Sequence, residues 1–301
     1  MLGVQNPWLV LIDLESRREV NRVLAAQDLL NPDAPCFKPI VRPNYTMTAV
    51  NPRDDTIAAA FNLGSEPRVF LFSPDLSKII RSWAVSRYVQ DLSWSSDGTA
   101  LTVLYSGAFD ENRKFVWNKP YEAPTTLPDV VIFDPGSGKE VMKFFSGGVQ
   151  SRISYSPDGR LIYCISVGVH DDYQYEKDVV RVFSASSGDL TQVISVPGTG
   201  VRNNFLLSAN GKLIVADAST KVRRHLLGEG PWGLKIGRFV LLDAASGSLI
   251  FEHHERMPGE TFTPLRFAFS PDGRRLFVDM SEYEKGRYGE RIDVYSLEDL
   301  Q

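Results

Sequence analysis

The sequence lacks the features that mark several large classes of protein. No apolar run approaches the roughly 18 residues needed to cross a bilayer, and the N-terminus lacks the basic start and apolar segment of a secretory signal. Positive charge is not in excess, since the net charge is −4, whereas phosphate binding needs a clustered basic surface. We therefore expect no membrane span and no nucleic-acid partner, and a cytoplasmic location unless a secretory leader has been lost.

Cysteine and catalytic motifs are also scarce. Of the 2 cysteines, Cys164 lies in an apolar run, which is typical of a small buried residue, and Cys36 lies in a Pro-rich loop; pairing between them stays open. No Gly-x-Ser-x-Gly elbow is present. Residues 228–233 match the string Gly-x-Gly-x-x-Gly, but no helix is expected after them, so we do not interpret them as a dinucleotide site.

Metal-ligating residue types are few and poorly spaced. His170, Asp171 and Asp172 could offer oxygen ligands to a hard cation, but they lack the alternating ligands of a calcium loop. His253 and His254 are adjacent on an expected strand and therefore point to opposite faces. We accordingly predict no catalytic residue, no metal site and no cofactor.

What the sequence does contain is a repeated hairpin. Ser156-Pro157-Asp158-Gly159 stands between two apolar runs. Proline fixes φ near the value that an early turn position needs, aspartate bonds its own backbone, and glycine accepts the left-handed conformation that closes the turn. Short β-rich runs around such a turn predict a β-hairpin. The pattern recurs, with decreasing regularity, at 270–273, 95–98, 208–211 and 51–54.

A second pair of expected strands follows each hairpin, around a turn rich in Ser and Gly. Residues 130–134 precede 140–145 in this way, and residues 179–183 precede 191–196. Each unit is therefore expected to contain four strands, and four-stranded units of roughly 40 to 50 residues are typical of β-propeller blades. We expect repeats near 46–84, 89–146, 150–196, 201–255 and 264–301.

The Ser-Pro-Asp-Gly turns followed by apolar strands resemble the WD40-like (TolB-type) β-propeller repeat over nearly the whole chain. The Trp-Asp dipeptide of strict WD40 repeats is absent, and Phe133-Asp134 and Leu242-Asp243 hold the corresponding place. The resemblance implies an all-β fold, with four-stranded antiparallel blades in a single domain over residues 1–301. We expect six blades, with five or seven as alternatives, and a strand pair within residues 8–24 that completes the ring.

Nearly all the extra length of the repeats falls between the second and third strands, at about 106–128, 168–177, 219–237 and 282–290. In a propeller these links emerge on one face. They are rich in aromatic residues and arginine, which are enriched at binding hot spots. The alternative is that the inserts only pack on one another and cover the blades. We predict a recognition face formed by Phe109, Arg113, Trp117, Tyr121, His170, Asp171, Asp172, Tyr173, Tyr175, Arg223, Arg224, His225, Trp232, Tyr283, Arg287 and Tyr288.

Two functions of different classes are compatible with these residues. The first is a non-enzymatic scaffold that binds a protein or peptide partner through the face with the inserts. The second is an enzyme or enzyme subunit of the hydrolase, lactonase or redox type with a site at the central channel, as in several propeller families. The absence of a catalytic constellation favours the scaffold. For the enzyme, the candidate residues are His170, Asp171, Asp172, Arg202, Asn203 and His225.

Overall fold

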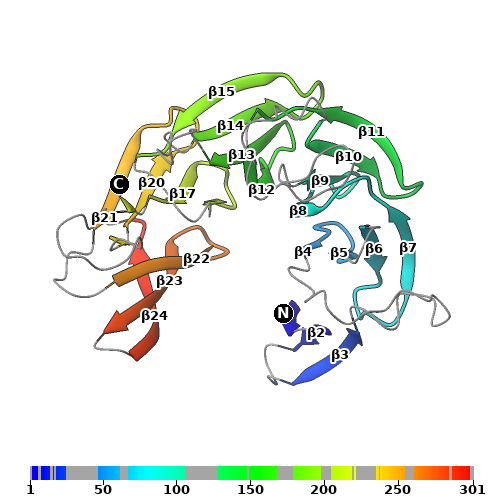
Figure 1. The fold of residues 1–301 in the computed structure, drawn as a ribbon, viewed down its shortest axis with the longest axis horizontal. Helices are drawn as coiled ribbons and strands as arrows, with labels where there is room; N and C mark the ends of the chain where they lie inside the picture. The colour runs from blue at the N-terminus through cyan, green and yellow to red at the C-terminus, as the bar shows by residue number, and fades with distance from the viewer. Residues whose placement is uncertain are drawn as a thin grey trace, which may run out of the picture. The chain divides into compact units, whose positions relative to one another are not determined.

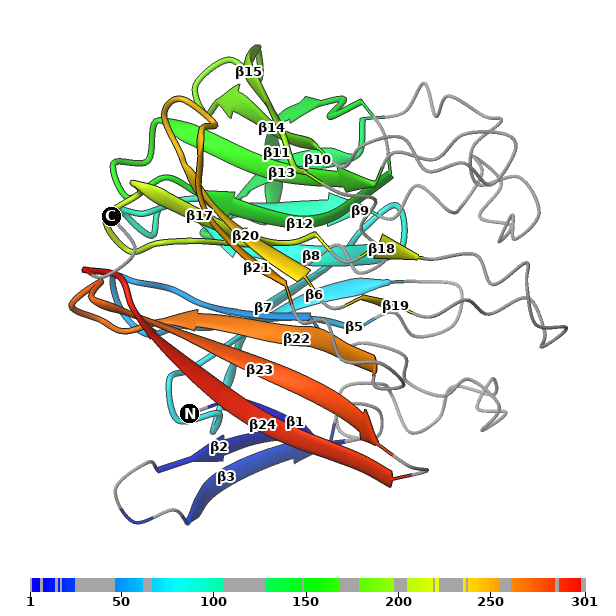
Figure 2. The ribbon, with the colours of Figure 1, turned by 90° about the vertical axis from the view of Figure 1, so that its left-hand side faces the viewer.

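A computed structural model describes the chain as strands joined by turns, divided into two compact units, Met1–Phe145 and Ser146–Gln301 (Figures 1 and 2). Every regular element in the described residues is a β-strand, which confirms the all-β prediction. No helix in this part of the chain is long and apolar enough to span a membrane. One domain over residues 1–301 stays a prediction.

The described residues are 2–5, 8–13, 16, 18–24, 47–61, 67–105, 128–147, 149–167, 179–197, 205–218, 220–221, 235–236, 238–254, 261–284 and 287–298.

The first unit contains three antiparallel sheets, in each of which the strands follow one another in chain order. Sheet A consists of β1 (Leu2–Gln5), β2 (Trp8–Ile12) and β3 (Glu19–Leu24). Sheet B consists of β4 (Met47–Val50), β5 (Ile57–Phe61), β6 (Arg68–Phe72) and β7 (Ile79–Ala84). Sheet C consists of β8 (Val89–Trp94), β9 (Leu101–Tyr105), β10 (Val130–Asp134) and β11 (Lys139–Phe144).

The second unit repeats this plan. Sheet D consists of β12 (Val149–Tyr155), β13 (Leu161–Val167), β14 (Val179–Ser184) and β15 (Leu190–Ser195). Sheet E consists of β16 (Phe205–Leu207), β17 (Leu213–Asp217), β20 (Arg238–Asp243) and β21 (Leu249–His254). A small pair, β18 (Thr220–Lys221) and β19 (Lys235–Ile236), lies within the link from β17 to β20. Sheet F consists of β22 (Thr261–Phe269), β23 (Arg275–Glu284) and β24 (Arg287–Ser296).

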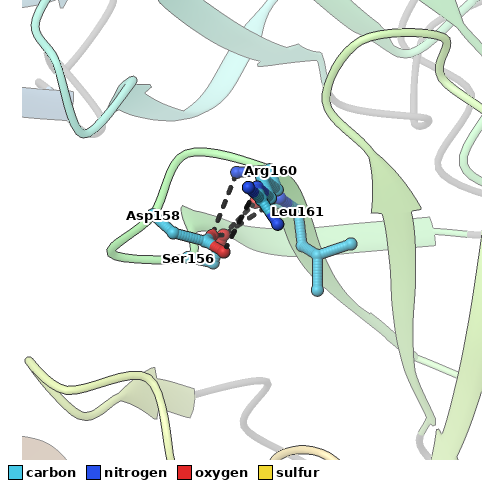
Figure 3. Close-up of polar contacts among 4 residues, drawn as sticks. All are labelled: Ser156, Asp158, Arg160 and Leu161. Carbon is cyan, nitrogen blue, oxygen red and sulfur yellow. Dashed lines mark hydrogen bonds and ion pairs between the residues drawn. The ribbon is translucent and has the colours of Figure 1, made fainter.

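The Ser-Pro-Asp-Gly hairpin has the predicted geometry (Figure 3). The Ser156 hydroxyl donates to Asp158 Oδ1 over 2.6 Å, and the same Oγ accepts the Leu161 amide over 2.9 Å. Asp158 Oδ1 also accepts the Arg160 amide over 3.1 Å. Gly159 has φ of +72°, the left-handed conformation that closes the turn. All these bonds lie within six consecutive residues, so the turn is specified locally.

Two hairpins place a residue other than glycine in the left-handed position. In the degenerate repeat at 51–54 that residue is Asp55, with φ of +60°, rather than Asp54 as the spacing of the repeats suggested. The turn from β6 to β7 is a further copy of the motif that was not foreseen from the sequence, Ser73-Pro74-Asp75-Leu76, with Leu76 at φ of +59°. Leu76 is only 3% exposed, so burial of its side chain offsets the backbone strain.

The cores lie between neighbouring sheets of the same unit. One cluster joins sheets B and C, a second joins D and E, and a third joins E and F. Sheets B and C are also joined by polar contacts, because Trp94 Nε1 donates to the Ala49 carbonyl and Asn51 Nδ2 donates to the Gly98 carbonyl, both over 3.1 Å. Cys164 is fully buried in β13, as predicted.

The two ends of the chain differ in detail from the expected strand pattern. The predicted strand pair within residues 8–24 is present as β2 and β3, but β1 was not foreseen and gives sheet A a third strand. The last repeat has three strands, as predicted. Its supposed insert at 282–290 is wrong, since β23 and β24 continue through it and pair as far as Glu284 with Arg287. The described sheets with three or four strands number six, and the blade count stays a prediction.

Candidate functional site

In sheets C, D and E the tight turns lie at one end of the sheet and the long links at the other. In sheet C, Tyr105 at the end of β9 is paired with Val89 at the start of β8. Val130 at the start of β10 is paired with Phe144 at the end of β11. The chain segments that leave Tyr105 and Phe144 therefore emerge at the same end of the sheet, which we call the insert end. The same relationship holds in sheet D, where Val167 is paired with Val149.

Most of the predicted recognition residues lie outside the described residues. These are Phe109, Arg113, Trp117, Tyr121, His170, Asp171, Asp172, Tyr173, Tyr175, Arg223, Arg224, His225 and Trp232. The enzyme candidates Arg202 and Asn203 lie outside them as well. For the first three inserts, the structure describes the residues at which each insert leaves and re-enters its sheet. We call these residues the roots of the insert, and they lie at the insert ends of sheets C, D and E.

The remaining three recognition residues lie on strands. Tyr283 is in β23, and Arg287 and Tyr288 are in β24. The register pairs Tyr283 with Tyr288 and Glu284 with Arg287, at the insert end of sheet F. The structure therefore brings these residues together as cross-strand neighbours on a hairpin rather than on a loop.

The roots of the first insert are joined by a buried arginine. Arg87 lies in the link from β7 to β8, and its guanidinium donates from Nη2 to the Pro128 carbonyl. Its Cζ lies 5.0 Å from the centroid of the Tyr105 ring, the last residue before the insert. The Tyr105 amide donates to the Asp129 carbonyl over 2.8 Å. We call Arg87, Tyr105, Pro128 and Asp129 the Arg87 clamp.

The clamp is almost completely removed from solvent. Exposure is 6% for Arg87, 1% for Tyr105 and 2% for Asp129. Burial lowers the pKa of Arg87, an effect that the Asp129 carboxylate opposes, and burial raises the pKa of Tyr105 to about 12. Arginine stays protonated and tyrosine stays neutral at physiological pH under these conditions. Charge and packing therefore join the residues at the two ends of the first insert.

The clamp was missed at the level of sequence, because its members are separated along the chain and form no motif. Arg87 stands alone in a short link, and Asp129 follows the insert rather than belonging to a turn. The only sequence indication was the position of Tyr105 and Asp129 at the two boundaries of the insert. The Arg87 guanidinium packs on Tyr105 at one end of the insert and bonds Pro128 at the other. This contact is visible only once the strands of sheet C are assembled.

Sheets E and F enclose a second polar group in an aromatic cluster. The His253 ring stacks on Phe239 with centroids 5.1 Å apart, and the Tyr295 hydroxyl lies 3.4 Å from His253 Nδ1. Phe239 also meets Tyr295 edge-on at 5.3 Å. The register pairs His253 with Phe239 and His254 with Arg238, so the two histidines occupy consecutive positions of β21. His253 thus contributes to packing between these sheets.

Comparison with known proteins supports the fold. No protein-family model matches the chain, and no curated protein matches it in sequence. Hydrazine synthase from Kuenenia stuttgartiensis matches in structure with a TM-score of 0.61 and 16% identity, over 84% of this chain and 63% of that chain. Dihydro-heme d1 dehydrogenase NirN, in complex with DHE, matches with a TM-score of 0.55 and 17% identity, over 98% of this chain and 52% of that chain.

A third match, the β-propeller domain of Cps50 (Swd1) from Myceliophteria thermophila, has a TM-score of 0.49 and 14% identity, over 81% of this chain and 66% of that chain. The chain thus spans 63% of the hydrazine synthase chain and about half of the NirN chain. Likeness at such low identity concerns the fold and not the function. Together with the four-stranded antiparallel sheets, it establishes that the chain has a β-propeller fold.

Proposed function

We propose that this chain is a non-enzymatic scaffold of WD40-like (TolB-type) repeats that binds a protein or peptide partner at the insert ends of its sheets. The observation that carries the proposal is the contrast between the two ends of sheets C, D and E. One end is closed by tight turns of fixed geometry, as at Ser95 and Ser156. The other carries the roots of the inserts, and in sheet C a buried clamp joins these roots.

The composition of the inserts supports a protein partner. They hold Trp117, Trp232 and several arginines and tyrosines, which are the residue types that dominate binding energy at protein interfaces. A rigid scaffold also lowers the entropy lost on binding, because insert roots that are held in place need not be ordered again. The net charge of −4 argues against nucleic acid as the partner.

The alternative function is a propeller enzyme or enzyme subunit. The observation that favours it is that hydrazine synthase and NirN, the two matches with the higher TM-scores, have enzyme names. Its candidate residues, such as His170 and Asp171, belong to the inserts or to links between sheets. Metal analysis of the purified protein separates the two proposals. A stoichiometric bound ion would favour the enzyme, since the scaffold proposal includes no cofactor.

The scaffold proposal is tested by a pull-down with matched variants. Trp117→Ala/Trp232→Ala removes the two largest aromatic side chains of the inserts. Arg160→Ala removes a side chain that is 85% exposed at the tight-turn end, and serves as the control. We expect a partner that binds the wild-type chain and the control and is lost from the double variant. Identical partners for all three proteins, with circular dichroism spectra unchanged, would contradict the proposal.

A further inference from the structure

The hairpin turn between β16 and β17 of sheet E contains the only Asn-Gly dipeptide of the sequence, Asn210-Gly211. The turns at 95–98, 156–159 and 270–273 have Asp-Gly at the equivalent positions. Asn210 is exposed, and Gly211 has φ of +71°. We propose that Asn210 is a site of spontaneous deamidation, which converts it to aspartate and completes the turn motif of this sheet. This inference is independent of the proposed function.

The reaction requires only groups of the turn itself and water. The Gly211 amide nitrogen loses its proton and attacks Asn210 Cγ, so that a C–N bond closes a succinimide ring and the side-chain nitrogen leaves as ammonia. Water then adds to Cγ, the bond from Cγ to the Gly211 nitrogen breaks, and this nitrogen regains a proton, which leaves aspartate. Asparagine is a thermolabile residue, and glycine has no side chain to hinder the attack.

The Asn210 side chain is held with its carbonyl group polarised. The Ser208 hydroxyl donates to Asn210 Oδ1 over 2.8 Å, and the Lys212 amide donates to the same oxygen over 3.0 Å. Donors aimed at a carbonyl oxygen stabilise the negative charge that develops there during attack on its carbon. Cγ is the attacked atom both when the ring forms and when it opens to aspartate. The two donors therefore favour both steps.

One hydrogen bond of the turn opposes the reaction. The Gly211 amide donates to the Ser208 carbonyl over 2.8 Å, and this bond must open before the nitrogen can attack. The turn lies at the surface, where Asn210 and Lys212 are exposed. Surface turns open locally much more often than the core unfolds. The bond therefore slows deamidation in the folded chain without preventing it.

The aspartate product fits the turn, because sheet C already contains it. The Ser95 hydroxyl donates to Asp97 Oδ1 over 2.6 Å and the Thr99 amide donates to it over 3.0 Å, which is the bonding pattern of Asn210. These bonds lower the pKa of Asp97 to about 2, so the carboxylate stays ionised and is a poor electrophile. A carboxylate in the same setting at residue 210 would not close the ring again.

The isomeric product, isoaspartate, does not fit the turn. It forms when water attacks the main-chain carbonyl carbon of the ring, and it adds one atom to the main chain between residue 210 and Gly211. The Gly211 amide would then be displaced from the Ser208 carbonyl, and the pairing of Leu213 with Asp243 would be disturbed. The folded turn should therefore select aspartate.

Peptide mapping of the aged full-length chain tests the proposal. The folded chain and a sample unfolded in urea are incubated at mildly alkaline pH, and trypsin then releases residues 203–212. We expect mass spectrometry to show replacement of the Asn210 amide by a hydroxyl in both samples. Asn51 is the internal control, because Pro52 has no N–H and cannot attack by this route. A protease that cleaves before aspartate but not before isoaspartate should find mainly aspartate in the folded sample and mainly isoaspartate in the unfolded one.

Two variants test whether the turn itself determines the reaction. Asp158→Asn places Asn-Gly in the turn of sheet D, where Ser156 and the Arg160 amide supply the same two donors. We expect this residue to return to aspartate at a rate similar to that of Asn210. Asn210→Gln lengthens the side chain, so ring closure is disfavoured and the residue should stay unchanged.

Two results would overturn the proposal. The first is a folded chain that keeps Asn210 intact while the unfolded chain converts it, since the turn would then protect the residue. The second is a fraction of isoaspartate as high in the folded chain as in the unfolded chain, since the turn would then not select aspartate.

Discussion

The guanidinium carbon of Arg87 lies 5.0 Å from the centroid of the Tyr105 ring, and both residues are nearly inaccessible to solvent. The two residues reach this position from different directions, Arg87 before β8 and Tyr105 at the end of β9. Their contact joins the start of the first insert to Pro128 at its end. A cation buried against an aromatic face contributes more than an exposed one, because water no longer competes for it.

Removal of Arg87 should therefore destabilise the first unit. Arg87→Ala leaves Asp129 buried without this cation, and we expect the free energy of unfolding to fall by about 3 kcal/mol. Arg87→Lys keeps the charge but loses the planar group over Tyr105, and should cost about 1 kcal/mol. Urea unfolding followed by tryptophan fluorescence measures both. A loss for Arg87→Ala no greater than that for Arg160→Ala, whose side chain is exposed, would contradict the assignment of a clamp.

Variants at Leu76 should show an unusual order of stability. It is buried but has φ of +59°, so Leu76→Ala keeps the strained backbone and loses the packing, at a cost of about 3 kcal/mol. Leu76→Gly loses the same packing but relieves the left-handed strain, and should be more stable than Leu76→Ala by about 1 kcal/mol. The same two substitutions, to alanine and to glycine, at Leu92 within strand β8 are the control. There alanine should be the better replacement, and alanine being better at both sites would refute the role of strain at Leu76.

Two turn glycines with the same conformation should differ in their tolerance of alanine. Gly98 and Gly273 have φ of +70° and +68°. A Cβ on Gly98 would lie 2.1 Å from Asn51 Oδ1, whereas one on Gly273 would meet its nearest atom, Asn210 Nδ2, at 3.7 Å. Gly273→Ala should cost about 1 to 2 kcal/mol from backbone strain alone.

Gly98→Ala adds a clash with the neighbouring sheet, for which we expect a further loss of about 2 kcal/mol. Thermal unfolding of both variants measures the difference. An equal loss of stability in Gly98→Ala and Gly273→Ala would show that the contact between Asn51 and Gly98 is not tight in solution.

The turn aspartates should make stability depend on acid pH. The Ser95 hydroxyl and the Thr99 amide lower the pKa of Asp97 from 3.8 to about 2. The folded state therefore holds this proton less strongly than the unfolded state. The stabilisation is complete above the unfolded pKa and is lost as the pH falls from about 4 towards 2.

Asp97→Asn tests this contribution with little change in shape, since Asn210 already accepts the equivalent bonds in sheet E. The variant should unfold more easily than the wild-type chain at pH 7, and the difference should narrow at pH 3. The reverse change, Asn210→Asp, should make sheet E more sensitive to acid. A difference between Asp97→Asn and the wild-type chain that does not depend on pH would show that the carboxylate charge is unimportant.

The sequence predicted those parts of the fold that depend on neighbouring residues. The hairpin at Ser156 closes through bonds between residues at most five apart, so its four-residue motif identified it at every clear repeat. The same local logic failed at Leu76, because burial in the core of sheet B overcame the preference for glycine. It also failed at 282–290. The aromatic and charged residues there predicted a loop, but strands β23 and β24 extend through this segment and pair with each other.

By itself, then, the sequence determined the four-stranded unit, most of its turns and the positions of the long links in sheets C, D and E, since each follows from short-range bonds and alternation along a strand. Only the tertiary structure decided which separated residues meet. Arg87 contacts Tyr105 and Pro128 because sheet C brings three segments to one end. Such contacts depend on the geometry of whole sheets, which short sequence patterns do not encode.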